Sequence, residues 1–248
     1  MSSCCLKGFK WDSKPQGRET TVNGLSCYVA GDNPDVAIMV IHDLYGWTFP
    51  NIRLLADHYA TEVGVTVYVP DLFGGEVLSP DLINNKAEWD KLDLPSFMAR
   101  NSKPIRGPQA ASFAKFLRTS AGHKHLGAIG YCFGGWVAFQ LGAGGDCNPS
   151  LVDCIVAAHP TFLTEDEIRA VKVPVQIIAP EVDPIFTEEL KAFAQAEIPK
   201  LGVPFDYQFF PGLEHGFSVR GNRENEAEMR GLSRAMRAAA GWFREWLV

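Results

Sequence analysis

Short apolar runs alternate with helical patterns from residue 25 onward, and this alternation restricts the folds open to the chain. The run VAIMVIHD (36–43) is almost continuously apolar, which is typical of a strand in a sheet covered on both faces. Further strands are expected at 25–30, 65–70, 126–131, 152–158, 173–179 and 205–210, and helices at 51–63, 108–120, 133–141, 187–198 and 224–247. This order predicts an α/β fold whose mostly parallel central sheet carries helices on both faces.

The whole chain is expected to form one domain. No repeat, linker or shift in composition divides residues 1–248, and α/β domains often reach roughly 250 residues. The net charge of -6 argues against nucleic acid or an anionic membrane as a partner. No stretch approaches a membrane-spanning length, and the six cysteines do not resemble a secreted disulfide framework, so we expect a cytoplasmic protein.

A candidate nucleophile, Cys132, lies in the segment GYCFGG (130–135), between an expected strand and an expected helix. This is the arrangement of a nucleophile elbow, a strained turn that presents the reactive side chain at the end of a strand. The residues two positions away on either side must be small to clear the adjacent chain, and Gly130 and Gly134 meet that need. The start of a helix just after Cys132 also favours a thiolate.

Two further residues complete a candidate catalytic triad. Asp183 follows the expected strand at 173–179, and His215 lies in a loop after the next strand. The order nucleophile, acid, histidine is that of the α/β-hydrolase fold. In such a triad His215 takes the proton of Cys132, and Asp183 orients the imidazole. Glu181 is an alternative acid on position alone.

An oxyanion hole is expected beside the nucleophile. In this fold one donor is the backbone N–H after the nucleophile, here that of Phe133, and the other comes from the loop after an earlier strand. That loop follows the strand at 36–41, and Leu44 is the predicted second donor.

Five motifs follow one another along the chain: HDLYGW (42–47), PDLF (70–73), GYCFGG (130–135), Asp183 and HGF (215–217). In their order and spacing they resemble the dienelactone hydrolase family, over nearly the whole chain. The early pair Cys4-Cys5 and the strand near 24–30 are similar to its eukaryotic, fungal-type branch. The resemblance implies a Cys-His-Asp triad that acts on cyclic enol esters such as dienelactone, with no metal and no organic cofactor.

The resemblance also implies roles for Asp43 and for arginines. In bacterial members a glutamate at the position of Asp43 pairs with the resting thiol and helps to ionise it. Aspartate is one methylene shorter, and a turn residue that accepts hydrogen bonds from loop amides is an equal alternative. Bacterial members hold a substrate carboxylate with arginines, for which Arg220 and Arg100 are the candidates here, each with a surface role as the alternative.

Aromatic residues are expected to line the pocket. Tyr45, Trp47 and Phe217 are the substrate-binding candidates, since an apolar pocket with few polar groups suits an unsaturated lactone. The long segment 72–108 is weakly periodic and is predicted to cross the edge of the sheet as a cap or lid. His159 is expected to wall the site or to serve as a structural histidine.

Hydrolysis of a lactone or enol ester through a thioester acyl-enzyme is the leading hypothesis. A thioesterase or small carboxylesterase in a biosynthetic or detoxification pathway would use the same triad. A non-catalytic binding protein that senses oxidants through Cys132 is the alternative from another class. The expected partner is a small lactone or ester, and the expected assembly is a monomer or a weak homodimer.

Overall fold

The central element is one eight-stranded sheet with the order β1-β2-β4-β3-β5-β6-β7-β8. The computed structural model describes residues 12–78, 93–144, 149–222 and 224–248. The strands from β4 to β8 in this order are parallel, whereas β1 and β2 are antiparallel. Their bounds are β1 Arg18–Val22, β2 Leu25–Ala30, β3 Val36–Ile41, β4 Thr66–Pro70, β5 His125–Tyr131, β6 Cys154–Ala158, β7 Val175–Val182 and β8 Phe205–Glu214. The prediction of a mostly parallel α/β sheet is confirmed.

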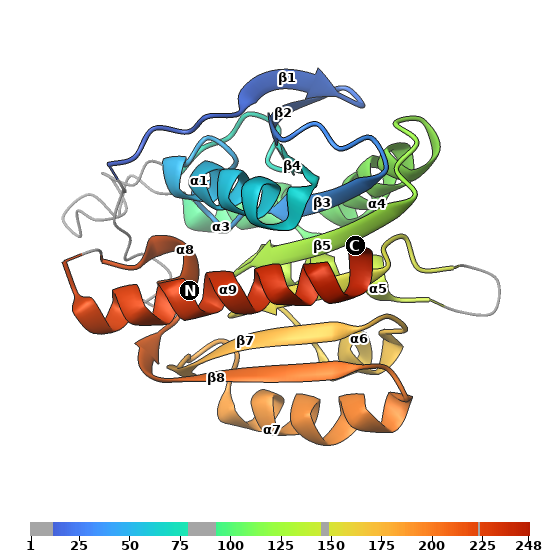
Figure 1. Cartoon of the computed structure of the whole chain (residues 1–248). Helices are drawn as coiled ribbons and strands as arrows, with labels where there is room; N and C mark the ends of the chain where they lie inside the picture. Colours follow the sequence, from blue (N-terminus) through green and yellow to red (C-terminus); the bar gives the residue numbers. More distant parts are fainter. Residues whose placement is uncertain (1–11, 79–92, 145–148, 223) are drawn as a thin grey trace.

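Helices cover both faces of the sheet (Figure 1). The long helix α9 and helix α1 pack on one face, and α4, α5 and α6 pack on the other. The helices are α1 Pro50–Tyr59 with its π-helical extension Ala60–Gly64, α3 Leu94–Arg100, α4 Lys103–Thr119, α5 Gly134–Gly142, α6 Glu165–Ala170, α7 Glu188–Glu197 with the 3-10 turn Ile198–Leu201, α8 Phe217–Arg220 and α9 Glu226–Leu247.

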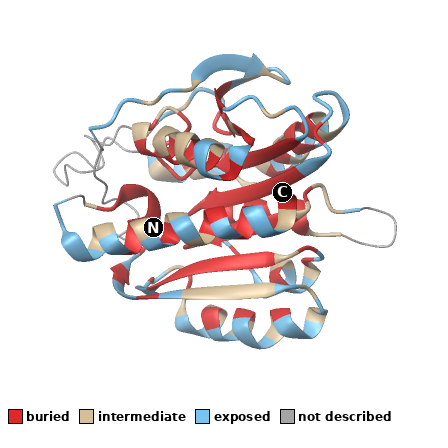
Figure 2. Cartoon of the chain, in the orientation of Figure 1, coloured by how far each residue is buried: buried red, intermediate tan, exposed pale blue. Residues whose placement is uncertain are grey.

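Strand β3 explains why one run can be apolar at every position. Ile38 and Val40 pack into the core beneath α1 and α9, whereas Met39 and Ile41 pack into the core on the opposite face. All six residues of the strand are buried. The central strands are accordingly buried along their length in Figure 2, while the outer side of α9 is exposed. Because the strands from β4 to β8 in this order are parallel, their carboxyl ends lie at one shared edge of the sheet, where ligands bind in folds of this type.

Four short elements and several element bounds differ from the sequence-based expectation. Strand β1 and helices α3, α6 and α8 were not expected. Strands β7 and β8 extend beyond the expected ends at residues 179 and 210, and α4 begins at Lys103, before the expected start at Pro108. Pro104 occupies the first turn of α4, where a missing N–H costs little, and Pro108 lies inside the helix.

The segment predicted as a lid is described in part. Residues 72–78 follow β4, and residues 93–108 form α3 and the first turns of α4, while the rest of the predicted lid lies outside the described residues. Arg100 Nε and Glu76 Oε1 lie 2.6 Å apart and connect the two described ends. Among the described helices, none has both the length and the apolar character needed to cross a bilayer.

Candidate active site

Cys132 occupies a strained turn between β5 and α5. Its backbone has a φ of +50°, which a non-glycine residue rarely adopts. The flanking glycines allow this turn, because a Cβ atom on Gly130 would lie 1.9 Å from Gly134 O. A Cβ atom on Gly134 would lie 2.3 Å from Ile41 O at the end of β3. The elbow is therefore shaped by backbone contacts that no larger side chain at these positions would permit.

The adjacent ends of β7 and β8 bring Asp183 and His215 together. The His215 amide donates to Val182 O at 3.0 Å, and His215 Nδ1 lies 2.8 Å from Asp183 Oδ2. The other oxygen of Asp183 accepts from the amides of Ile185 and Phe186, both at 3.0 Å. These bonds fix the carboxylate, which in turn holds the imidazole in one orientation and tautomer.

Glu181, the alternative acid, has another role in the structure. Its side chain is directed to β8, where its Oε2 accepts a hydrogen bond from the amide of Gly212 at 2.6 Å. Lys191 Nζ donates to the backbone oxygen of Glu181 at 2.8 Å and steadies the turn. The structure therefore brings Asp183, and not Glu181, to His215.

His215 is electrostatically linked to Cys132. Burial lowers the pKa of His215, but the charge of Cys132 and the bond to Asp183 outweigh it and raise that pKa to about 9. His215 Nε2 forms no hydrogen bond of regular geometry with any described residue, so its link to Cys132 is a close polar contact. Such surroundings favour the thiolate–imidazolium pair over the neutral pair.

The predicted oxyanion donors flank the elbow. Phe133 precedes α5, and Leu44 lies in the loop after β3; both residues are buried in the same core. Within the described ranges, neither amide donates to a protein acceptor. Two buried N–H groups without partners are what an oxyanion hole requires, because the substrate oxygen completes their hydrogen bonding.

Asp43 and Arg220 form a buried ion pair close to Cys132. Arg220 Nε lies 3.0 Å from Asp43 Oδ2, and both side chains are almost completely buried. Burial raises the pKa of Asp43 to about 6; Arg220 opposes this shift and the charge of Cys132 reinforces it. Asp43 Oδ1 also accepts from the amide of Tyr45 at 3.0 Å, and Arg220 lies over the Tyr45 ring. Asp43 thus serves as a turn residue and as a charged neighbour of the thiol.

The other substrate-binding candidates make contacts of their own outside the candidate triad. Arg100 is half-exposed and paired with Glu76, and among the described residues it does not contact the triad. Trp47 packs against Arg53, whose guanidinium carbon lies 4.8 Å from the ring centroid. Phe217 is buried against Phe210, with 4.8 Å between ring centroids, and contributes to the core as well as to the site.

Two residues near the candidate triad come from the loop after β6. The ring of His159 lies 4.9 Å from that of His215, and its Nε2 lies 2.8 Å from Ser218 Oγ. The pKa of His159 is well below its usual value because of burial, so this histidine is neutral. Thr161 Oγ1 lies 3.2 Å from Cys132 Sγ. No sequence motif marks Thr161, and sequence reasoning missed it.

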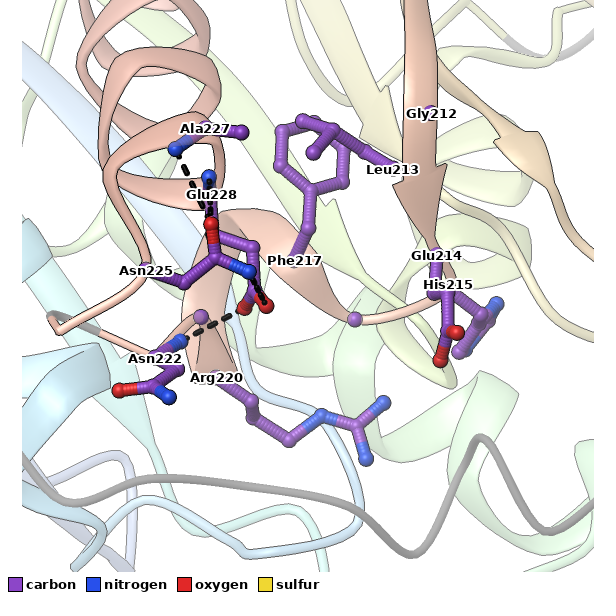
Figure 3. Close-up of a pocket in the computed structure, with 12 residues that line it drawn as sticks. Gly212, Leu213, Glu214, His215, Phe217, Arg220, Asn222, Asn225, Ala227 and Glu228 are labelled. Carbon is purple, nitrogen blue, oxygen red and sulfur yellow. Dashed lines mark hydrogen bonds between the residues drawn. The ribbon is translucent and has the colours of Figure 1, made fainter.

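A cavity of about 450 Å³ adjoins His215. Figure 3 shows it between the end of β8, helix α8 and the start of α9, with Asn222, Asn225 and Glu228 joined by hydrogen bonds on one side. His215 and Arg220 belong both to this lining and to the surroundings of the thiol. In the described part of the chain, no group of three His, Cys, Asp or Glu side chains is arranged to hold a metal ion.

Comparison with known proteins agrees with this geometry. The sequence profile of the dienelactone hydrolase family matches residues 25–247. The chain belongs to the dienelactone hydrolase family. Like other members, it is a carboxylic ester hydrolase.

Relatives in this family include fungal and mammalian proteins. The hydrolase tropI of Talaromyces stipitatus is 30% identical, over 99% of this chain and 96% of its own length. Dienlactone hydrolase 1 of Gibberella moniliformis is 26% identical, over 99% of this chain and 94% of its own. The structure of a dienelactone hydrolase from Anabaena variabilis superposes with a TM-score of 0.66 at 15% identity, covering 95% of this chain and 100% of that one, which shows the shared fold.

Proposed function

We propose that this dienelactone hydrolase family member cleaves a lactone or enol ester through a Cys132–His215–Asp183 triad and a thioester acyl-enzyme. The 2.8 Å bond between His215 and Asp183, beside a cysteine in a strained elbow, carries the proposal. Each member of the triad follows the end of a parallel strand, where ligands bind in sheets of this type.

Acylation begins with the thiolate of Cys132. The sulfur attacks the carbonyl carbon, a C–S bond forms, and the carbonyl electron pair moves to oxygen, where the amides of Leu44 and Phe133 donate hydrogen bonds. When the electron pair returns, the ring C–O bond breaks and His215 gives its proton to the leaving oxygen. In a lactone this oxygen stays attached to the acyl group, so the ring opens without loss of a fragment.

Deacylation uses the same groups in reverse. His215, now neutral, takes a proton from water, whose oxygen attacks the thioester carbon. The C–S bond breaks, the thiolate of Cys132 leaves, and the carboxylic acid is released. Asp183 supports the imidazolium in both steps without accepting its proton.

The cavity favours a small substrate. A volume of about 450 Å³ lies within the range of small-molecule sites. We propose Arg220, ahead of Arg100, as the group that meets a substrate carboxylate, because Arg220 lines this cavity and is near the thiol. Asp43 would then be released from Arg220 and left to interact with Cys132. Tyr45, Trp47 and Phe217 stay the candidates for apolar contacts.

A thioesterase or small carboxylesterase would use the same groups on another acyl chain, and substrate profiling separates these activities. A sensor of oxidants is less favoured, because only 1% of the Cys132 surface is exposed. Four further expectations stay predictions. They are a cytoplasmic location, a monomer or weak homodimer, a cap or lid at 72–108 within one domain, and chemistry without a cofactor.

The test is hydrolysis of a small activated aryl ester between about pH 5 and 9 by the wild type, Cys132→Ala and His215→Ala. The proposal expects turnover that both variants reduce by roughly 10³-fold or more. Equal background rates from all three proteins would reject it for simple esters, and activity that survives Cys132→Ala would reject the nucleophile. A panel of lactones and thioesters with and without a carboxylate then identifies the substrate class.

A further inference from the structure

The loop between β6 and α6 carries unusual backbone strain. In the described chain, four non-glycine residues have a positive φ, and three of them lie at this site: Cys132 at +50°, His159 at +39° and Phe162 at +60°. Each such conformation costs free energy and persists where surrounding contacts require it. The strain therefore marks residues 159–162 as an element built around the nucleophile.

Backbone contacts join this loop to the elbow. The amide of Cys132 donates to Ala158 O at 3.1 Å, and the amide of Thr161 donates to Cys132 O at 2.9 Å. Pro160 packs where a side chain on Gly135 would be, since a Cβ atom there would lie 2.4 Å from Pro160 Cβ. The position of Thr161 relative to Cys132 is thus fixed on both sides.

The loop is also held from outside. Lys103, at the start of α4, donates to Phe162 O at 2.6 Å and forms an ion pair with Glu167 at 2.6 Å. Glu167 belongs to the capping box that begins α6. These contacts anchor the end of the loop that follows Thr161.

The side chain of Thr161 points to the sulfur. Thr161 is 3% exposed, and its hydroxyl oxygen lies 3.2 Å from Cys132 Sγ. Among the residues that the structure describes, this sulfur is the one hydrogen-bond partner of the hydroxyl. A buried hydroxyl without a hydrogen-bond partner would destabilise the fold, so the contact with Cys132 satisfies the hydroxyl of Thr161.

We propose that Thr161 is a positioning residue for Cys132: its hydroxyl donates a hydrogen bond to the thiolate and directs the sulfur during acylation. The inference rests on the proposed function, because it assigns Thr161 a role at the same nucleophile. No proton is transferred by Thr161. The proton of the thiol goes to His215, and Thr161 keeps its own.

Several charged or titratable groups surround the sulfur and contribute to its ionisation. His215 comes from the end of β8, Asp43 and Tyr45 come from the loop after β3, and Arg220 of α8 acts through its pair with Asp43. Thr161 differs from them because it carries no charge at any pH of interest. Removal of the Thr161 hydroxyl should change the stability of the thiolate without adding or removing a titrating group.

The experiment compares Thr161→Val, which keeps the shape but lacks the hydroxyl, with Thr161→Ser, which keeps the hydroxyl. The ultraviolet absorbance of the Cys132 thiolate is titrated between about pH 5 and 9, as the difference between each protein and its Cys132→Ala counterpart. Thr20→Val, on the exposed edge strand β1, is the matched control. Circular dichroism establishes that each variant is folded.

We expect a thiolate-to-thiol ratio roughly tenfold lower in Thr161→Val at a given pH, since a hydrogen bond to a charged group is strong. Thr161→Ser and Thr20→Val should follow the wild type. In ester hydrolysis, kcat of Thr161→Val should fall in parallel while KM changes little. If Thr161→Val does not fold, Thr161→Ala replaces it in the same titration.

An unchanged titration in the folded variant without the hydroxyl would overturn the inference. So would a Thr161→Ser variant as impaired as Thr161→Val, since the methyl group would then be the important part. The titration needs no substrate turnover, so its result is separate from the proposed function. That function fails if ester hydrolysis survives Cys132→Ala, whatever Thr161→Val does to the absorbance.

Discussion

At the scale of residues, burial and charge act in opposite directions on His215. Removal from water disfavours the imidazolium, but the neighbouring Cys132 and Asp183 raise its pKa to about 9. Asp43 shows the reverse case, because burial raises its pKa to about 6 despite the adjacent Arg220. The site therefore favours a protonated imidazole at His215 and a carboxyl group of raised pKa at Asp43, both close to one sulfur.

The identity of the acid is tested by a matched pair of variants. Asp183→Asn should lower kcat by about 10³- to 10⁴-fold, because the amide favours the wrong tautomer of His215. Glu181→Gln removes the charge two positions earlier but leaves the bond between His215 and Asp183 in place. It should retain near wild-type kcat in the aryl ester assay. The reverse result would transfer the role to Glu181.

Stability should depend on pH through His215. Its pKa rises from 6.5 in the unfolded chain to about 9 in the folded protein, so His215 itself keeps its proton to a higher pH when the protein is folded. The stability that this shift contributes is complete below about pH 6.5 and is lost as the pH rises through about 9. Urea unfolding should show this loss in the wild type and a smaller loss in His215→Gln. Equal slopes in both proteins would contradict the linkage.

At the scale of elements, the pattern of apolar residues predicted most of the sheet. Fully buried strands such as β3 are apolar throughout and stand out in the sequence. Strand β1 does not stand out in the sequence, because four of its five residues are exposed and follow no apolar period. Helix α8 has four residues, too few for a helical period, although it carries Arg220.

Glycine contacts at the elbow give a prediction at this scale. Gly134→Ala should destabilise the fold by about 2 kcal/mol or more, because the new Cβ would lie 2.3 Å from Ile41 O. Gly241→Ala is the control, since that helical glycine has nothing within 4 Å of its added Cβ. It should stabilise α9 by roughly 0.5–1 kcal/mol. Equal destabilisation in urea unfolding would show that the elbow contact is unimportant.

At the scale of the whole molecule, the site assembles from distant parts of the sequence. The candidate triad could be proposed from the sequence because its residue types follow strand ends in a known order. The pair of Asp43 and Arg220 could not, since nothing local in the sequence indicates that the loop after β3 meets α8. The contact of Thr161 with Cys132 likewise depends on the path of one loop, and no residue pattern specifies that path.

The ion pair between Asp43 and Arg220, which are far apart in the sequence, gives the last prediction. Arg220→Gln should destabilise the protein by about 3–5 kcal/mol, because it leaves the buried carboxylate of Asp43 without its partner. Adding Asp43→Asn should recover part of that loss, and a double-mutant cycle in urea measures the coupling. Additive effects of the two substitutions would contradict a direct interaction.

The elbow has a consequence for how such proteins diverge. Its shape depends on distances between backbone atoms of Gly130, Gly134 and Ile41, and the sulfur of Cys132 takes no part in them. The attacking atom is therefore exchangeable while its surroundings are not. In a related protein with this turn, one substitution of cysteine by serine would replace sulfur by oxygen and keep the backbone geometry of the turn.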